Sequence, residues 1–209
     1  MLHDGIDARF EHVRQEILRF IASQGDGPTS QPLSILSREL SAARLPDRIQ
    51  DARRLPGCRH LDAALSMAME GPMASLAGAF AALEPSLRWI RSEHYRESLG
   101  DDYMNNYCYT NILGFEALIP HDRVVAAFFV IGPGQHYPRH HHEAVEIYYP
   151  FGGDTLWGQD DAPPRPRPPG KPVHNTPWLP HEMITRTTPL FTFCLWVSPG
   201  PIQLARLTG

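Results

Sequence analysis

The chain is poor in cysteine, and its few cysteines form no recognisable pair. Cys58, Cys108 and Cys194 are odd in number and far apart, and no CxxC motif occurs. This pattern predicts neither a disulfide framework nor a zinc site held by sulfur. We therefore interpret the three residues as buried free thiols.

Long apolar runs and basic clusters are also missing. No stretch approaches the ~20 apolar residues of a membrane span, and the N-terminal sequence lacks the apolar core of a signal peptide. The chain has 19 Lys and Arg against 23 Asp and Glu, a formal net charge of −4, and its basic residues are scattered. We therefore expect a cytoplasmic protein that acts on a small-molecule substrate, with no nucleic acid and no membrane as partner.

The first half of the chain has the pattern of helices. Its 209 residues are enough for one well-buried core with a sizeable appendage. Apolar residues recur at helical spacing over residues 7–23, 32–43 and 60–83, and Gly71 and Pro72 interrupt the last range. We predict a helical N-terminal region over residues 1–110.

The second half has the pattern of strands. Short β-branched or aromatic runs bounded by Gly, Pro and Asp cover residues 124–132, 143–151 and 190–198. Between the last two runs, residues 162–177 contain so many prolines that we expect a stiff, exposed connection without regular structure. The predicted fold class is mainly β, with one β-barrel domain over residues 111–209 behind the helical region.

Four histidines and two glutamates gather in GQHYPRHHHEAVEIYYPFGG, residues 134–153. Residues two apart share one face of a strand, so His140, His142, Glu146 and Tyr148 are expected to point the same way. Imidazole nitrogens with a carboxylate oxygen suit one divalent metal ion such as zinc, iron or manganese. A solvated polar patch is the alternative, and three consecutive histidines alone would favour it.

The full spacing of this stretch favours the metal site. Gly134, His140, His142, Glu146 and Gly153 occupy every fixed position of the first cupin motif, and the stretch lies between predicted strands, as that motif requires. The segment therefore resembles a cupin. The resemblance implies a jelly-roll barrel with an open, catalytic type of metal site.

A later histidine completes the metal site of cupins. Here the resemblance implies His181, with His174 as the alternative inside the proline-rich connection. The second cupin motif is incomplete, because Thr176, Trp178 and Thr185 stand where it has Pro, Gly and Asn. The ligand assignment to His181 is kept despite these departures.

Two tyrosines accompany the expected metal ligands. Tyr148 shares their face of the strand, and Tyr137 lies on the approach to it. A phenol is a poor base at neutral pH, but a nearby divalent cation favours its ionised form, which can remove a proton from carbon. The alternative is that both are structural tyrosines with buried rings, which is how we interpret Tyr149 on the opposite face.

Together these residues resemble the cupin-type dimethylsulfoniopropionate lyases of the DddQ and DddL kind, which have a helical region ahead of the barrel. The resemblance implies cleavage of dimethylsulfoniopropionate to dimethyl sulfide and acrylate by β-elimination. By the same resemblance, Tyr148 and Tyr137 match the catalytic tyrosines. The matching metal positions are His142, Glu146, Tyr148 and His181, with His140 as the neighbouring cupin histidine.

The substrate implied by the resemblance carries a fixed positive charge on sulfur. Aromatic faces bind such cations, so we name Trp178 and Trp196 as substrate-binding candidates, with Phe128 and Phe193 as further ones. Ordinary core aromatics are the alternative for all four.

Two other functions stay open at this point. One is a cupin metalloenzyme of another reaction class, a dioxygenase or an isomerase, acting on a small carboxylate. The other is a non-catalytic barrel that binds a small molecule. The sequence also leaves the native metal and the oligomeric state open, with a homodimer as one option because cupins often pair through exposed barrel edges.

Overall fold

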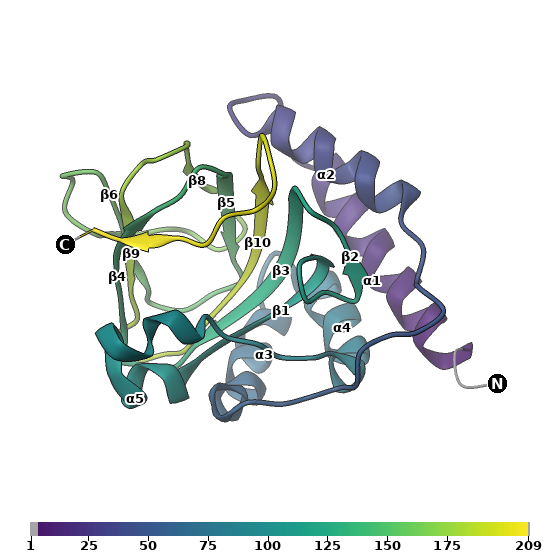
Figure 1. Cartoon of the computed structure of the whole chain (residues 1–209), viewed down its shortest axis with the longest axis horizontal. Coiled ribbons are helices and arrows are strands. Elements are labelled where there is room, and N and C mark those ends of the chain that lie inside the picture. Colours follow the sequence, from purple (N-terminus) through teal and green to yellow (C-terminus); the bar gives the residue numbers. More distant parts are fainter. Residues whose placement is uncertain (1–3, 209) are drawn as a thin grey trace.

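The structure, a computed structural model, describes residues 4–208 and places a layer of helices against one side of a β-barrel (Figure 1). The α-helices are α1 (Asp4–Ala22), α2 (Ser30–Ala42), α3 (Leu61–Met69), α4 (Ala74–Leu83) and α5 (Arg96–Asn106). Single 3-10 turns are η1 (Pro56–His60), η2 (Glu84–Ser86) and η3 (Glu93–Tyr95). Within the described residues, no helix is both long and apolar enough to cross a membrane.

The helical prediction is confirmed for α1 to α4, including the break between α3 and α4 around Gly71. Helix α5 lies within the predicted helical region but was not predicted as a separate helix, because its sequence RESLGDDYMNN has no apolar periodicity. Gly100, with φ 74°, interrupts its helical backbone. Packing of buried Tyr103 and Met104 holds this segment in place, which no local pattern reveals.

The barrel consists of two facing sheets. The six-stranded sheet has the order β2-β1-β3-β10-β5-β8, and the five-stranded sheet has the order β11-β4-β9-β6-β7. The strands of the first are β2 (Ile119–Pro120), β1 (Tyr107–Gly114), β3 (Val124–Ile131), β10 (Leu190–Val197), β5 (Val145–Pro150) and β8 (Val173–Asn175). Those of the second are β11 (Arg206–Leu207), β4 (His136–His141), β9 (His181–Ile184), β6 (Leu156–Gln159) and β7 (Arg165–Pro166). The mainly β class with a helical N-terminal region is as predicted.

The six-stranded sheet is buried on both faces, against helices outside and against the barrel interior inside. Helices α2 and α3 contact β10, and α2 also contacts β3. Along β3 the side chains alternate strictly between the two cores. Val124, Ala126, Phe128 and Val130 belong to the helix-side core, whereas Val125, Ala127, Phe129 and Ile131 belong to the barrel-side core. Each large apolar side chain buried in this way contributes about 1.5–3 kcal/mol.

The prediction of no regular structure over residues 162–177 is wrong at two places. The proline-free triplet Val173–Asn175 forms β8, which pairs with β5 so that Asn175 lies opposite Glu146. These three residues keep the N–H groups that a ladder needs. Strand β7 contains Pro166, which is tolerated because β7 is at the edge of its sheet.

Candidate metal centre

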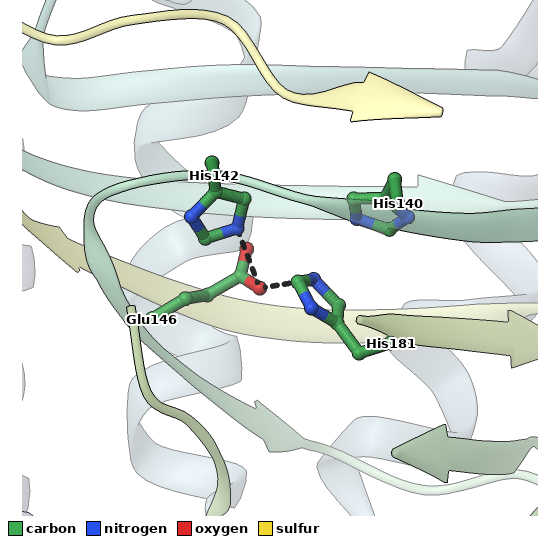
Figure 2. Close-up of side chains that lie close together, drawn as sticks. All are labelled: His140, His142, Glu146 and His181. Atoms are coloured by element: carbon green, nitrogen blue, oxygen red, sulfur yellow. Dashed lines mark hydrogen bonds and ion pairs between the residues drawn. The ribbon is translucent and has the colours of Figure 1, made fainter. Parts of the chain in front are cut away.

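Four predicted ligands come together at the meeting of the two sheets (Figure 2). His140 lies on β4, His142 follows the end of β4, Glu146 lies on β5 and His181 lies on β9. All four are at least 97% buried, and one ligand atom of each lies within 4.8 Å of the others. His140 pairs directly with His181 across the β4–β9 ladder.

The residues converge for a different reason from the one that the sequence suggested. We expected a single strand to present His140, His142 and Glu146 on one face. Instead the chain bends between the end of β4 at His141 and the start of β5 at Val145, and the two strands enter different sheets. The ligands therefore approach one point from facing sheets.

Backbone carbonyls fix the orientation of all three imidazoles. In His140, His142 and His181 the Nδ1 atom lies 2.8, 3.0 and 2.8 Å from a carbonyl oxygen. The carbonyls belong to Pro138, Ala144 and Leu179. Because a carbonyl only accepts, each Nδ1 carries the hydrogen, and each Nε2 presents a lone pair. This is the arrangement that histidine ligands of metals use.

The Nε2 lone pairs of His142 and His181 face the carboxylate oxygen of Glu146, and the two repel each other unless a cation lies between them. The Nε2 atoms of His142 and His181 lie 3.3 and 2.8 Å from Oε2 of Glu146. In the neutral imidazoles, whose hydrogen is on Nδ1, neither contact contains a proton, so a proton on Nε2 or a metal ion must supply the positive charge that balances the carboxylate. Such a buried set of nitrogen and carboxylate donors fits a divalent metal ion.

The protonation states also suit metal binding. Burial raises the pKa of the Glu146 carboxyl, but His142 and His181 in their charged forms outweigh it and hold the pKa well below its ordinary value, as the charge of a metal ion in their place would. Burial and the proximity of His181 hold the pKa of His140 well below its ordinary value. An ionised carboxylate and a neutral imidazole are the forms that ligate metals.

Two further side chains anchor Glu146. Trp196 Nε1 donates a hydrogen bond to Oε1 at 2.5 Å, and Asn175 Nδ2 donates one to Oε2 at 2.9 Å. The Trp196 ring also stacks on His142, with centroids 4.2 Å apart. No local pattern identifies Asn175, because its contact with Glu146 depends on the β5–β8 register inside the proline-rich segment. The alternative ligand His174 precedes Asn175 on β8 and therefore points to the other side of the sheet.

A cavity lined by aromatic residues adjoins the cluster at Glu146. Tyr137 and Tyr148 both line it, as does Trp196. Burial, and then the charge of Glu146, raise the pKa of Tyr148 well above its ordinary value, and burial does the same for the pKa of Tyr137. Both phenols are therefore neutral in this state, and a cation in the cluster would favour the ionised form of Tyr148.

The other predicted aromatic candidates do not reach this cavity. Trp178 is 48% exposed and lies with its ring 5.7 Å from that of His141, outside the barrel. Phe128 and Phe193 pair across β3 and β10 and point into the helix-side core. Phe129, one residue further along β3, lines the cavity instead.

Much of the cavity wall consists of residues that were not predicted from the sequence. Tyr95 and Ser92 come from the helical region, and Tyr107 and Tyr109 come from β1. The tyrosines in YCYTNILG stand two apart, which places them on one face of a strand. That spacing was the available signal for β1, whereas nothing local identifies Ser92 or Tyr95.

Comparison with known proteins shows the family to which this chain belongs. The profile of the dimethylsulfoniopropionate lyase family matches residues 30–192. Dimethylsulfoniopropionate lyase DddQ of Ruegeria pomeroyi is 28% identical over 123 residues, which are 59% of this chain and 61% of that protein. Putative dimethylsulfoniopropionate lyase DddL of Cereibacter sphaeroides is 29% identical over 130 residues, 62% of this chain and 53% of that protein. The aligned parts thus span less than two thirds of either relative.

Solved structures extend the likeness of the fold to almost the whole chain. A chain from the crystal structures of the dimethylsulfoniopropionate lyases RdDddP and RnDddQII superimposes with a TM-score of 0.72 at 22% identity, covering 97% of this chain and 98% of that one. The crystal structure of DddQ from Ruegeria pomeroyi gives a TM-score of 0.70 at 22% identity and covers 97% of each chain. At this identity the superpositions establish the fold.

Proposed function

We propose that this chain, which belongs to the dimethylsulfoniopropionate lyase family, cleaves dimethylsulfoniopropionate to dimethyl sulfide and acrylate. One observation carries the proposal. Glu146 is a member of the buried metal cluster and also part of the wall of the tyrosine-lined cavity. A molecule in this cavity therefore contacts both the metal centre and two phenols.

The side chains that would hold the metal ion are His140, His142, Glu146 and His181, with Tyr148 beside them. A bound divalent ion supplies positive charge that stabilises both a substrate carboxylate and an ionised phenol. Trp196 and Asn175 keep the Glu146 carboxylate in place through their hydrogen bonds. Zinc, iron and manganese all accept this donor set.

Tyr148 and Tyr137 are the two candidates for the base. In the proposed elimination, a phenolate oxygen takes a proton from the carbon next to the substrate carboxylate. The electron pair of that C–H bond forms the C=C bond of acrylate, and the C–S bond breaks with its pair leaving on dimethyl sulfide. The products are acrylate, dimethyl sulfide and a neutral tyrosine, with no change of oxidation state in the protein.

The remaining cavity wall suits a cation that has no hydrogen to donate. Tyr109 and Phe129 stack with centroids 5.5 Å apart, and both line the cavity with Trp196. An aromatic face stabilises a desolvated cation by about 2 kcal/mol. These faces are the proposed site for the sulfonium group.

The test is gas-phase detection of dimethyl sulfide from the purified protein supplied with dimethylsulfoniopropionate, with and without a chelator. We expect release that the chelator abolishes and added metal restores, with kcat/KM of ~10⁴ M⁻¹s⁻¹ or above. Slow release would indicate a side activity of a cupin with another substrate. No release from metal-loaded protein would reject the lyase and lead to oxygen-consumption assays for a dioxygenase.

A further inference from the structure

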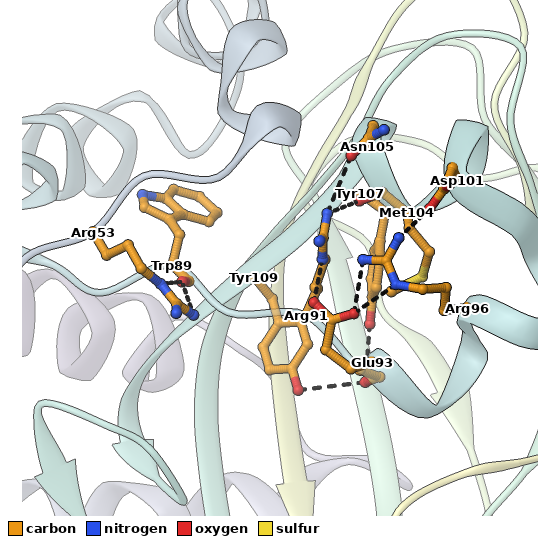
Figure 3. Close-up of polar contacts among 11 residues, drawn as sticks. Arg53, Trp89, Arg91, Glu93, Arg96, Asp101, Met104, Asn105, Tyr107 and Tyr109 are labelled. Carbon is orange, nitrogen blue, oxygen red and sulfur yellow. Dashed lines mark hydrogen bonds and ion pairs between the residues drawn. The ribbon is translucent and has the colours of Figure 1, made fainter.

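Ser92 and Tyr95, from the segment of residues 91–96 in the helical region, line the cavity, and polar contacts of the neighbouring side chains hold this segment in place (Figure 3). Ion pairs hold it from the outer side. Arg91 Nε lies 2.6 Å from Oε1 of Glu93, and Arg96 pairs with both Glu93 and Asp101. Arg91 also donates a hydrogen bond to the carbonyl of Met104 on α5 at 2.6 Å. Residues 91–96 are therefore held against α5 by these contacts.

Two side chains of the same segment face the cavity. Ser92 Oγ accepts a hydrogen bond from the Tyr107 hydroxyl at 3.1 Å and lies 3.4 Å from the Tyr109 hydroxyl. Tyr95, which is 2% exposed, reaches Tyr137 on β4. The helical region thus contacts one of the two candidate bases directly.

The hydrogen bonds of Tyr95 have a fixed direction. Its hydroxyl lies 3.3 Å from the carbonyl of Ala205 and 3.0 Å from the hydroxyl of Tyr137. A carbonyl only accepts, so the single hydrogen of Tyr95 is donated to Ala205. The oxygen of Tyr95 is then left to accept the hydrogen of Tyr137.

This direction determines what Tyr137 presents to the cavity. The Tyr137 ring is held by His140, on which it stacks with centroids 4.0 Å apart and an interplanar angle of 13°. The remaining freedom is rotation of the hydroxyl hydrogen about the C–O bond. Because Tyr95 takes that hydrogen, a lone pair of the Tyr137 oxygen is turned toward the cavity.

We propose that Tyr95 is a positioning residue for the lyase reaction and acts through Tyr137, whose hydroxyl oxygen it holds in place at the cavity wall by their hydrogen bond. The inference rests on the proposed function and adds a residue of the helical region to the barrel site. It also fixes the position of the Tyr137 oxygen: the neutral phenol donates its hydrogen to Tyr95, and an ionised Tyr137 acting as the base would instead accept the hydrogen that Tyr95 turns away from Ala205.

Tyr103 offers a matched control. Like Tyr95, it is a buried tyrosine of the same aromatic cluster, with its ring centroid 5.9 Å from that of Tyr137. Its hydroxyl has no hydrogen-bond partner among the described residues, and its side chain does not line the cavity. Replacing it with Phe removes a buried hydroxyl without removing a contact to Tyr137.

The experiment is a double-mutant cycle of Tyr95→Phe and Tyr137→Phe, with Tyr103→Phe as control, in the full metal-loaded chain. Dimethyl sulfide release from dimethylsulfoniopropionate gives kcat and KM, and elemental analysis gives bound metal. We expect Tyr95→Phe to lower kcat about tenfold, with KM and bound metal changed by less than about twofold. In the Tyr137→Phe background, Tyr95→Phe should have no further effect.

Three outcomes would overturn the inference. They are wild-type kcat in Tyr95→Phe, an equal loss in Tyr103→Phe, and a loss in the double variant that multiplies those of the single variants. Wild-type kcat in Tyr137→Phe would do the same, because Tyr95 is proposed to act through that residue.

A second measurement does not depend on turnover. The chain has seven tyrosines, and labelling with ¹³C at Cζ reports the hydrogen bonding of each phenol. Tyr95→Phe should move the Tyr137 signal, which Tyr137→Phe identifies by its loss, and Tyr103→Phe should not. An unmoved signal rejects the hydrogen bond, whereas a moved signal with no release of dimethyl sulfide by the wild type rejects the lyase reaction alone.

Discussion

The two faces of the six-stranded sheet are made by neighbouring residues and have opposite chemistry. Phe128 points outward and packs on Phe80, with centroids 4.1 Å apart, whereas Phe129 points into the cavity beside Tyr109. On β5, Tyr149 packs on Phe20 in the helix-side core, and Tyr148 lines the cavity. One step along a strand therefore separates a residue of the helix-side core from a residue of the cavity wall.

The difference lies in what each face demands of a side chain. The residues of β3 and β5 that face the helix-side core pack among apolar side chains, for which the right volume is the main requirement. The barrel side buries ionisable groups, and each of these needs a partner of suitable charge or hydrogen-bonding capacity. The barrel side is thus where the sheet accepts a cost in stability, which is typical of a functional site.

The largest effect should come from the metal cluster. We expect His142→Ala to lower metal affinity by at least 10- to 100-fold and to reduce lyase activity to background, because the cluster loses one lone pair and its charge balance. His174→Ala is the control, since β8 turns His174 away from the cluster. Elemental analysis and dimethyl sulfide release measure the two effects. Full metal occupancy in His142→Ala, or metal loss in His174→Ala, would contradict the assignment.

The neighbouring residues Phe128 and Phe129 test whether the helix-side face of the sheet serves stability and the barrel-side face serves substrate binding. Phe128→Ala should lower the free energy of unfolding by about 3–5 kcal/mol, because it opens a cavity in a close-packed core. Phe129→Ala widens a cavity that already exists, so its loss of stability should be smaller and its main effect a higher KM. Denaturant unfolding and substrate titration give the two values. Equal losses of stability with an unchanged KM would show that the two faces do not differ in this way.

The neighbouring residues Tyr148 and Tyr149 test the same difference between the two faces, because each Tyr→Phe change removes a single hydroxyl. Tyr148→Phe should lower kcat by about 10²-fold, the scale of a lost general base, or about 2.7 kcal/mol of transition-state stabilisation. Tyr149→Phe should leave kcat unchanged, because the Tyr149 hydroxyl makes no hydrogen bond among the described residues and points away from the cavity. Tyr137→Phe completes the set. Near-normal kcat in both Tyr148→Phe and Tyr137→Phe would exclude a tyrosine base.

The sequence predicted the fold and the four residues of the buried His/Glu cluster because both depend on local spacing. Apolar periodicity identified α1 to α4, and the intervals between His140, His142 and Glu146 identified the first cupin motif. The prediction that these residues lie together was right although they do not lie on a single strand. The same spacing brings them together across the bend between β4 and β5.

The cavity wall could not be predicted in the same way. Alternate residues of β3 face the barrel interior, and the sequence does not show which set does, because the run VVAAFFVI is apolar on both faces. Whether Phe128 or Phe129 faces inward therefore could not be predicted. Asn175 and Tyr95 reach the site through strand register and through packing of the helical region, and neither leaves a local pattern. Trp178 was misplaced because the loop before β9 carries it outside, where it has φ 64°.

The smallest effect should come from outside both faces, where Asp154 in the β5–β6 connection ties two segments together. Its carboxylate accepts hydrogen bonds from the backbone N–H and hydroxyl groups of Thr187 and Thr188. Although partial burial opposes them, these bonds hold the pKa of Asp154 well below its ordinary value of 3.8. A depressed pKa means that the stabilisation is complete above about pH 4, the unfolded value, and is lost as pH falls through the folded pKa.

We expect Asp154→Ala to lower the free energy of unfolding by about 1 kcal/mol at pH 7, with the difference shrinking toward pH 2 and kcat unchanged. Urea unfolding of both proteins at the two pH values measures this, and a difference that persists in acid would mean that the ionised carboxylate is not its source.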